Sequence, residues 1–199
     1  MYLKSTLTTL ITVLFLAGSL SAQDMNLTIQ GTPQMKIDGD SNVRSWDADV
    51  TQVDATLVLT GIETFSIEAM TPDAFKEMTI TMPVERINSD SRSLTRNIHN
   101  YLKADDHPNI TFTLKSVDEI EVNSGTALIT ATGVINAAGK DHEVTMNVTA
   151  RMSNNGTINF SGEQELLMTS FEIDPPTAIM GTVRARDEFR IIYSVDFGQ

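Results

Sequence analysis

Apolar and polar residues alternate along much of the chain. From Met78 to Val84, apolar side chains occupy every second position, and Thr79, Thr81 and Pro83 lie between them. Successive side chains of a β-strand point to opposite faces, so this alternation predicts a strand with one buried face. The same period recurs at 110–114, 144–152 and 189–197.

Shorter apolar segments bounded by turn-forming residues predict further strands. These segments cover 34–38, 47–60, 62–69, 126–135 and 157–168. The tripeptides at 123–125 and 154–156 each end in glycine, as hairpin turns often do. The pattern therefore predicts about eight or nine strands, joined mostly by short turns.

One segment has the period of a helix. Leu94, Ile98 and Leu102 recur at four-residue spacing, and the polar run 88–91 before them offers several N-cap residues. We predict a helix over 91–103. Its apolar stripe is narrow, so the helix should lie against a sheet or a barrel mouth.

These elements predict a mainly β protein, an antiparallel β-barrel of about eight strands with one helix near 91–103. The sequence shows neither the alternating strand–helix order that is typical of a parallel sheet nor an internal repeat. A two-sheet sandwich is the alternative arrangement. Residues 23–199 show no linker or change of composition and are predicted to form one domain.

The first 22 residues have the features of a secretory signal peptide. Lys4 precedes an apolar stretch over 7–17, and small residues follow it up to Ala22. The apolar stretch is shorter than the roughly 20 residues that a membrane-spanning helix needs. We predict cleavage after Ala22 and a periplasmic or secreted protein that is not anchored by a transmembrane helix.

Charge and cysteine content exclude several kinds of function. The chain carries 14 basic and 26 acidic residues, a net charge of −12, so a nucleic-acid partner is not expected. The absence of cysteine excludes disulfides, thiol nucleophiles and cysteine-ligated metals.

No catalytic or metal-binding motif is present in the sequence. The three histidines, His99, His107 and His142, lack the spacing that places two ligands on one face, so we predict no metal site and no cofactor. The run Asp105-Asp106-His107 is the one compact acid–base cluster, and it defines an alternative hypothesis of an exported enzyme. Pro108 favours extended backbone at His107, which indicates instead the entry to a strand.

Several motifs occur in a consistent order along the chain. They are the early run Gly39 to Trp46, the run Leu102-Lys103-Ala104-Asp105-Asp106-His107-Pro108-Asn109-Ile110-Thr111-Phe112, the segment Ala131 to Ile135, and Met168-Thr169-Ser170-Phe171 with Asp174-Pro175-Pro176, Gly181 and Asp187. Together they closely resemble the YceI-like family over about 35–197. Members with the early segment commonly have a histidine before the tryptophan dipeptide, where this chain has Arg44, so a role for that imidazole does not transfer.

The resemblance implies a lipocalin-like barrel, exported to the periplasm or beyond, that holds a long amphiphilic lipid such as a polyisoprenoid or a quinone-like molecule. It implies no cofactor and no catalytic residues. The alternative is an exported stress-response or interaction module whose barrel has a solid core and no lipid ligand.

The two-residue period then predicts which side chains point into the barrel. Phe112, for example, lies in the register opposite Thr111 and Lys115. The predicted ligand-binding residues are Ile80, Met82, Ile110, Phe112, Leu114, Val144, Met146, Met168, Phe189 and Ile191. The candidates for contact with a polar headgroup at the barrel end are Arg92, Arg96 and Lys103 on the helix.

Overall fold

The computed structural model describes residues 24–178 and 180–199. The predicted signal peptide lies outside the described residues. Within them, no helix is long and apolar enough to cross a membrane.

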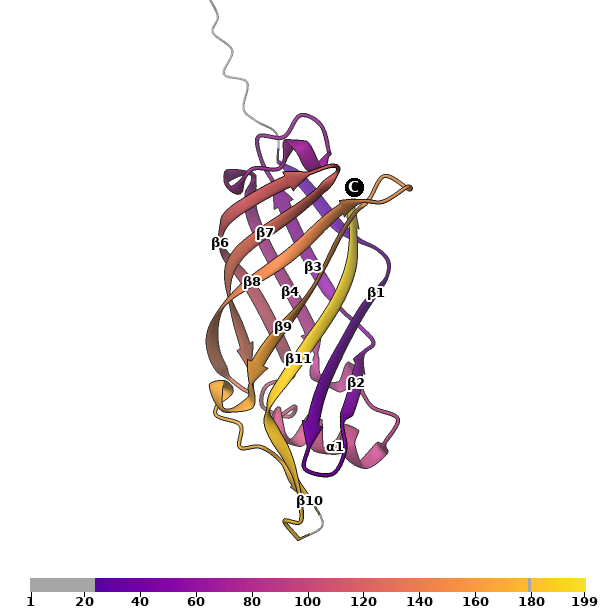
Figure 1. Cartoon of the computed structure of the whole chain (residues 1–199), viewed down its shortest axis with the longest axis vertical. Helices are drawn as coiled ribbons and strands as arrows, with labels where there is room; N and C mark the ends of the chain where they lie inside the picture. The colour runs from indigo at the N-terminus through magenta and orange to yellow at the C-terminus, as the bar shows by residue number, and fades with distance from the viewer. Residues whose placement is uncertain (1–23, 179) are drawn as a thin grey trace, which may run out of the picture.

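Eight antiparallel strands close into a barrel, which confirms the predicted fold (Figure 1). Around the barrel the order is β11-β9-β8-β7-β6-β4-β3-β1, and β1 pairs with β11 to close the ring. The strands are β1 (Met25–Ser41), β3 (Asp54–Leu59), β4 (Phe75–Pro83), β6 (Asn109–Asn123), β7 (Thr126–Ala137), β8 (Lys140–Met152), β9 (Ile158–Leu167) and β11 (Val183–Gly198).

Short elements gather at the two ends of the barrel. The end with the helix α1 (Arg92–Tyr101) also carries the strands β2 (Trp46–Val50), β5 (Ile87–Asn88) and β10 (Thr177–Ala178) (Figure 1). The single-turn 3-10 helices are η1 (Ile67–Ala69), η2 (Pro72–Ala74), η3 (Val84–Arg86) and η4 (Met168–Phe171).

The predicted helix is present and begins where its capping residue stands. Ser91 is the N-cap, and its hydroxyl accepts a hydrogen bond from the Leu94 amide at 3.4 Å. At the other end, Lys103 takes a positive φ of 53°, which stops the helix. Leu94, Ile98 and Leu102 lie at the barrel mouth, as their narrow stripe predicts.

The strand predicted over 62–69 is wrong. This segment is a loop that ends in η1, and its apolar side chains plug one end of the barrel instead of pairing in the sheet. Ile67 and Met70 are almost fully buried there, against a cluster that includes Leu27 and Leu57. The same apolar spacing occurs in a strand with one buried face and in a loop whose apolar side chains fill the end of a barrel, so the sequence pattern cannot distinguish the two.

The strand predicted over 47–60 is interrupted at 51–53. Both parts pair with β1: β2 pairs with its second half, where Gly39 faces Trp46, and β3 pairs with its first half, where Leu27 faces Leu57. The registers of the two pairings differ by only one residue, and residues 51–53 between them are not part of a strand. The segment predicted at 34–38 is part of the much longer β1.

Two bulges change the inward face of β6. Its register against β7 shifts between Leu114 and Ser116 and again between Val117 and Glu119. Val117 therefore packs inside the barrel, although the alternation that starts at Ile110 would place it outside. At the end of β8 the alternation also fails, because Met152 is 42% exposed.

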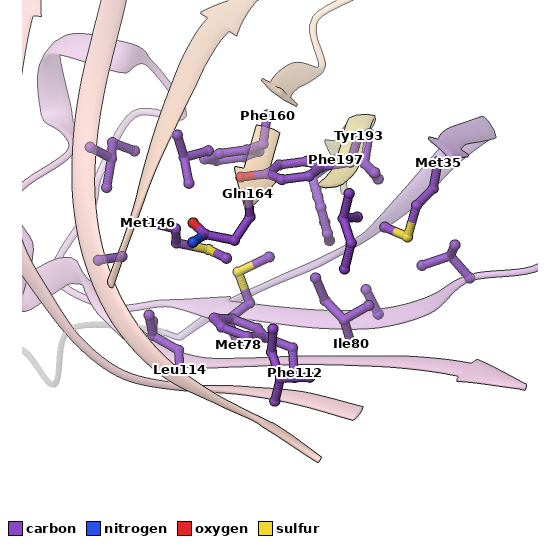
Figure 2. A pocket seen from close by; sticks show the side chains of 18 of the residues that line it. Met35, Met78, Ile80, Phe112, Leu114, Met146, Phe160, Gln164, Tyr193 and Phe197 are labelled. Atoms are coloured by element: carbon purple, nitrogen blue, oxygen red, sulfur yellow. The ribbon is translucent and has the colours of Figure 1, made fainter. Parts of the chain in front are cut away.

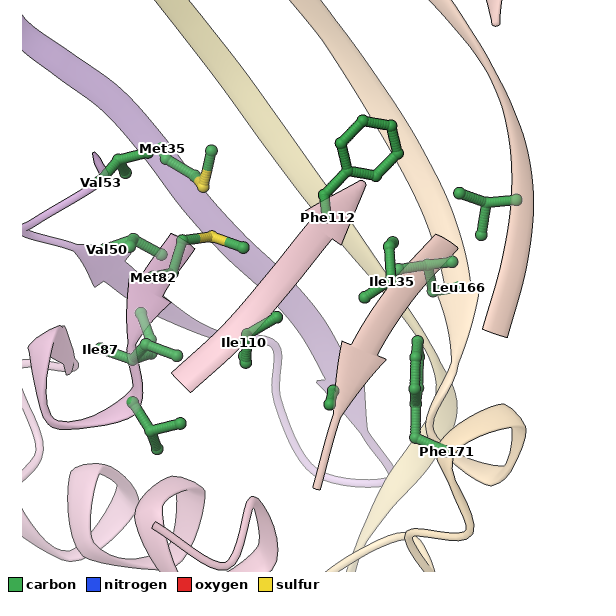
Figure 3. Packing of buried hydrophobic residues seen from close by; sticks show 14 residues of the cluster. Met35, Val50, Val53, Met82, Ile87, Ile110, Phe112, Ile135, Leu166 and Phe171 are labelled. Atoms are coloured by element: carbon green, nitrogen blue, oxygen red, sulfur yellow. The ribbon is translucent and has the colours of Figure 1, made fainter. Parts of the chain in front are cut away.

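Two groups of buried side chains fill most of the barrel. One surrounds the plug at the closed end, and the other lies towards α1 and includes Phe112, Ile135, Leu166 and Phe171 (Figure 3). The barrel is thus closed at one end and packed only in part towards the helix.

The plug gives a prediction for stability. Leu27 is 0% exposed and Leu128 is 46% exposed. We expect Leu27→Ala to lower the free energy of unfolding by about 2–5 kcal/mol and Leu128→Ala to change it by about 0.5 kcal/mol. Urea denaturation of both variants measures the difference. Equal losses would show that Leu27 does not belong to a tightly packed core.

Candidate ligand-binding site

A large cavity opens at the barrel end that carries α1. We call it the mouth chamber, and its volume is about 610 Å³, within the range of small-molecule pockets. Its walls are mostly apolar. They include Leu94, Ile98 and Leu102 from α1, and Trp46, Leu166, Phe171 and Phe189 from the barrel and its loops.

A smaller cavity of about 100 Å³, the deep chamber, lies inside the barrel (Figure 2). Ile135 and Ile191 line both chambers, so the two share a wall. Flexible methionine side chains supply part of the lining of the deep chamber, namely Met35, Met78, Met82 and Met146. Unbranched methionine fills irregular space and adjusts to different neighbours.

Three aromatic side chains occupy space over glycines of neighbouring strands. The Trp46 ring lies over Gly39 and the Phe112 ring over Gly133, where an added Cβ would come within 2.1 Å and 2.4 Å of ring carbons. The Tyr193 hydroxyl lies over Gly162, 2.7 Å from the position of such a Cβ. A larger residue at any of these three positions would have to displace the aromatic side chain.

The deep chamber contains two polar side chains among the described residues that line it, Gln164 and Tyr193. Gln164 lies beside Met78 and Met146, and Tyr193 lies beside Phe197 (Figure 2). Burial raises the pKa of Tyr193 from 10.0 to about 12, because the ionised phenol would lose its hydration in the barrel.

The loop between β1 and β2 forms part of the rim of the mouth chamber. Arg44 lines the chamber from this loop and is exposed to solvent. The loop is held in place by Ser41, whose hydroxyl donates to the Arg44 carbonyl at 2.7 Å. Asn42 ties it to the β10–β11 hairpin, because its side-chain oxygen accepts from the Arg184 amide at 2.8 Å.

Nine of the ten predicted ligand-binding residues line one of the two chambers. Ile80, Met82, Phe112, Leu114 and Met146 line the deep chamber; Ile110, Met168 and Phe189 line the mouth chamber; Ile191 lines both. Val144 is buried in the hydrophobic cluster near the mouth and is not among the described lining residues. A role of these residues in ligand binding stays a prediction.

The predicted headgroup residues lie away from the mouth chamber. Arg92, Arg96 and Lys103 are exposed, and none of the three is among the described residues that line the chamber. At 100° per residue Arg92 and Arg96 share the face of α1 opposite Leu94 and Tyr101, and Lys103 lies just beyond the end of the helix. Arg44 is instead the cationic side chain that the described part of the chain places at the chamber.

The cluster of the alternative enzyme hypothesis lies outside both chambers. Asp105 and Asp106 are exposed, and the His107 ring packs over Gly139 in the β7–β8 turn. Within residues 24–178 and 180–199, no group of three or more histidine, aspartate and glutamate side chains is arranged to hold a metal ion. The geometry therefore gives this hypothesis no cleft in which an acid and a base converge.

Some lining residues were not predicted as part of a site. The alternation over 189–197 places Tyr193 inward, and the same argument applied to 157–168 would have placed Gln164 beside Phe160 and Leu166. A two-residue period assigns a side chain to a face of its strand but does not show which side chains border a cavity. The rim residue Arg44 has no periodic signal, because it lies in a loop.

The closed barrel, the plug at one end and the apolar chamber at the mouth define a lipocalin-like protein. A family model described as the YceI-like domain matches residues 25–197. The chain belongs to the YceI-like family. A comparison with curated proteins found no match.

Solved structures share the fold at low sequence identity. BcnA of Burkholderia cenocepacia superposes with a TM-score of 0.62 at 15% identity, covering 84% of this chain and 96% of that chain. A polyisoprenoid-binding domain from Saccharophagus degradans, implicated in plant cell wall breakdown, has a TM-score of 0.62 at 6% identity and covers 86% and 97%. The YceI protein of Campylobacter jejuni has a TM-score of 0.54 at 15% identity and covers 95% and 97%.

The raised pKa of Tyr193 gives a prediction for stability at alkaline pH. The unfolded chain ionises this phenol near the ordinary pKa of 10.0, whereas the folded chain ionises it at about 12. The difference between the two pKa values makes a contribution to the free energy of unfolding that is fully present below pH 10 and is lost as the pH rises to 12. We expect Tyr193→Phe to lose less stability than the wild type over this interval in urea denaturation. Parallel losses would mean that water reaches the hydroxyl.

Proposed function

We propose that this protein is an exported carrier that holds a long amphiphilic lipid, of the polyisoprenoid or quinone-like class, in its barrel. The observation that supports the proposal most directly is the apolar mouth chamber of about 610 Å³ at the open end of the barrel. The name of the Saccharophagus degradans domain, which has the same fold, supports the choice of ligand class.

Transfer of an apolar chain from water into such a chamber provides enough free energy for binding. A chain of about 20 carbons gains on the order of 16 kcal/mol at about 0.8 kcal/mol per methylene. Association costs of roughly 4–15 kcal/mol are subtracted from this gain. A favourable balance therefore needs neither a catalytic group nor a metal ion.

The methionine-lined deep chamber adapts the protein to a long chain. At about 100 Å³ it is too small for more than the end of a ligand. Met78, Met82 and Met146 adopt other rotamers at low cost, so a chain that fills the mouth chamber extends inward by displacing them.

Export is the second part of the proposal. It rests on the basic residue Lys4, the apolar stretch over 7–17 and the small residues before Gln23, which have the order of a cleavable signal peptide. A periplasmic or secreted location fits the need to move lipid through an aqueous compartment.

The lipid carried by the purified protein tests the function. We expect native mass spectrometry of the mature protein to show a non-covalent adduct that organic solvent extracts as a lipid. Protein that is isolated empty and takes up neither a prenol nor a prenylquinone from solution would contradict the carrier and favour the interaction module.

Variants in the same experiment test the location of the lipid. Leu94→Asp, at a half-buried position of the mouth chamber, and Phe112→Asp, deeper in the barrel, place a carboxylate against the apolar chain. We expect each to lower lipid occupancy at least tenfold, because an unpaired buried charge costs several kcal/mol.

Lys115→Ala is the control for these variants. Lys115 is exposed and pairs with Glu143 on the outer surface, so its loss should leave occupancy unchanged. Thermal unfolding shows which variants are folded, and Leu94→Asp keeps the test valid if Phe112→Asp does not fold. Equal occupancy in the folded variants and the control would place the lipid outside the barrel.

A further inference from the structure

The two most exposed large apolar side chains among the described residues lie at the mouth end of the barrel. Met180 is fully exposed, and Val43 is 66% exposed. Met180 lies in the turn of the β10–β11 hairpin, and Val43 lies in the loop between β1 and β2. The hairpin projects beyond the end of the barrel (Figure 1). Exposed apolar residues that gather on one side of a protein mark a surface that meets a partner.

Hydrogen bonds from Asn42 hold these two loops together. Its backbone amide donates to the Arg184 carbonyl at 3.0 Å, and its side-chain oxygen accepts from the Arg184 amide at 2.8 Å. Its side-chain nitrogen donates to the Thr182 carbonyl at 2.9 Å. Val43 and Met180 therefore belong to one pre-formed edge, and little conformational entropy is lost when this edge meets a surface.

Each loop also carries a cation close to its apolar residue. Arg44 follows Val43, and Arg184 lies at the start of β11; both are exposed. Neither is paired with a carboxylate among the described residues, and the Arg184 Nε donates only within its own turn, to the Gly181 carbonyl at 3.4 Å. We call the four residues Val43, Arg44, Met180 and Arg184 the mouth edge.

We propose that the mouth edge docks the protein on the surface of a phospholipid bilayer. Val43 and Met180 insert at the boundary between the headgroups and the acyl chains, where apolar side chains leave water. The guanidinium groups of Arg44 and Arg184 contact the lipid phosphates. The proposal rests on the carrier function and names the partner with which the carrier exchanges its lipid.

The acidic net charge of −12 does not oppose this contact at physiological ionic strength, where charges are screened beyond about 8 Å. The charges nearest the surface therefore decide. Of the acids close to the mouth edge, Asp40 is paired with Arg186 at 3.2 Å. Asp187 accepts hydrogen bonds from the Thr169 hydroxyl and amide, at 2.6 Å and 2.9 Å.

The position of the mouth edge favours a bilayer as the partner. Val43 and Arg44 line the mouth chamber, and so does Tyr101, whose ring is 36% exposed. Tyrosine is common at the membrane–water interface, because its ring is apolar and its hydroxyl is polar. A bilayer that covers this edge faces the entrance of the chamber. It offers acyl chains to the apolar residues and phosphates to the arginines, and it holds the lipid that the carrier collects or delivers.

Flotation with vesicles tests the docking surface. The vesicles are phosphatidylcholine with a minor fraction of phosphatidylglycerol, titrated at physiological salt. The variants are Met180→Glu and Arg184→Gln, because neither residue is among the described residues that line the mouth chamber. The matched controls are Met152→Glu and Arg151→Gln, at adjacent exposed positions near the β6–β7 turn at the plugged end; Met152 is 42% exposed.

We expect Met180→Glu to weaken vesicle binding at least tenfold, because it removes an inserted side chain and brings a carboxylate to the phosphates. Arg184→Gln should weaken it about fivefold, the contribution of one cation near a lipid surface. Both controls should bind vesicles like the wild type. Native mass spectrometry should show the same lipid occupancy in all four variants.

Two outcomes would overturn the proposal. If the wild type carries lipid but does not float with the vesicles, the bilayer is not the partner, and the carrier function stands. If Met180→Glu and Met152→Glu have equal effects, the mouth end is not the docking surface. A wild type that floats but is isolated empty and takes up no lipid would retain the docking surface and contradict the carrier function.

Discussion

Hydrogen bonding between β1 and β11 closes the sheet, and the interior exists because of this pairing. It joins the first and last strands of the domain, so it must bring together segments that are far apart in the sequence. β1 bends to do this through a register shift between Gln30 and Gln34, where Gly31 has a φ of 74°. The loop at 60–74 then closes one end, and α1 borders the other, so the large chamber opens beside the helix.

A closed barrel of this size is either filled by side chains or open enough for one slender ligand. In this protein the barrel interior changes from filled to open along the barrel axis. Large apolar residues such as Ile67 fill the plugged end, methionines leave a small adjustable space in the middle, and the mouth is open. Gly39 and Gly133 leave room for the Trp46 and Phe112 rings, which a larger residue at either position would have to displace.

The period of two in the sequence located each long strand of the barrel but gave only part of β1 and β6, and the period of four predicted α1 and its position at the mouth. It failed at 62–69, where apolar residues are buried in a plug, and after Leu114, where bulges move Val117 to the inner face. Contacts between glycines and rings on neighbouring strands depend on register, which the pattern within one strand does not contain. For the same reason Tyr193 could be assigned to the inner face, but not recognised as a hydroxyl without a partner.

The position of a bound lipid relative to the methionines tests the account most directly. Methyl-labelled methionine allows NMR contacts from a lipid to be assigned along the barrel. We expect contacts to Met168 in the mouth chamber and to Met82 and Met146 in the deep chamber, and none to Met152, which is 42% exposed. Contacts confined to Met152, or a lipid that perturbs no methyl group inside the barrel, would contradict the claim that the lumen is the binding site.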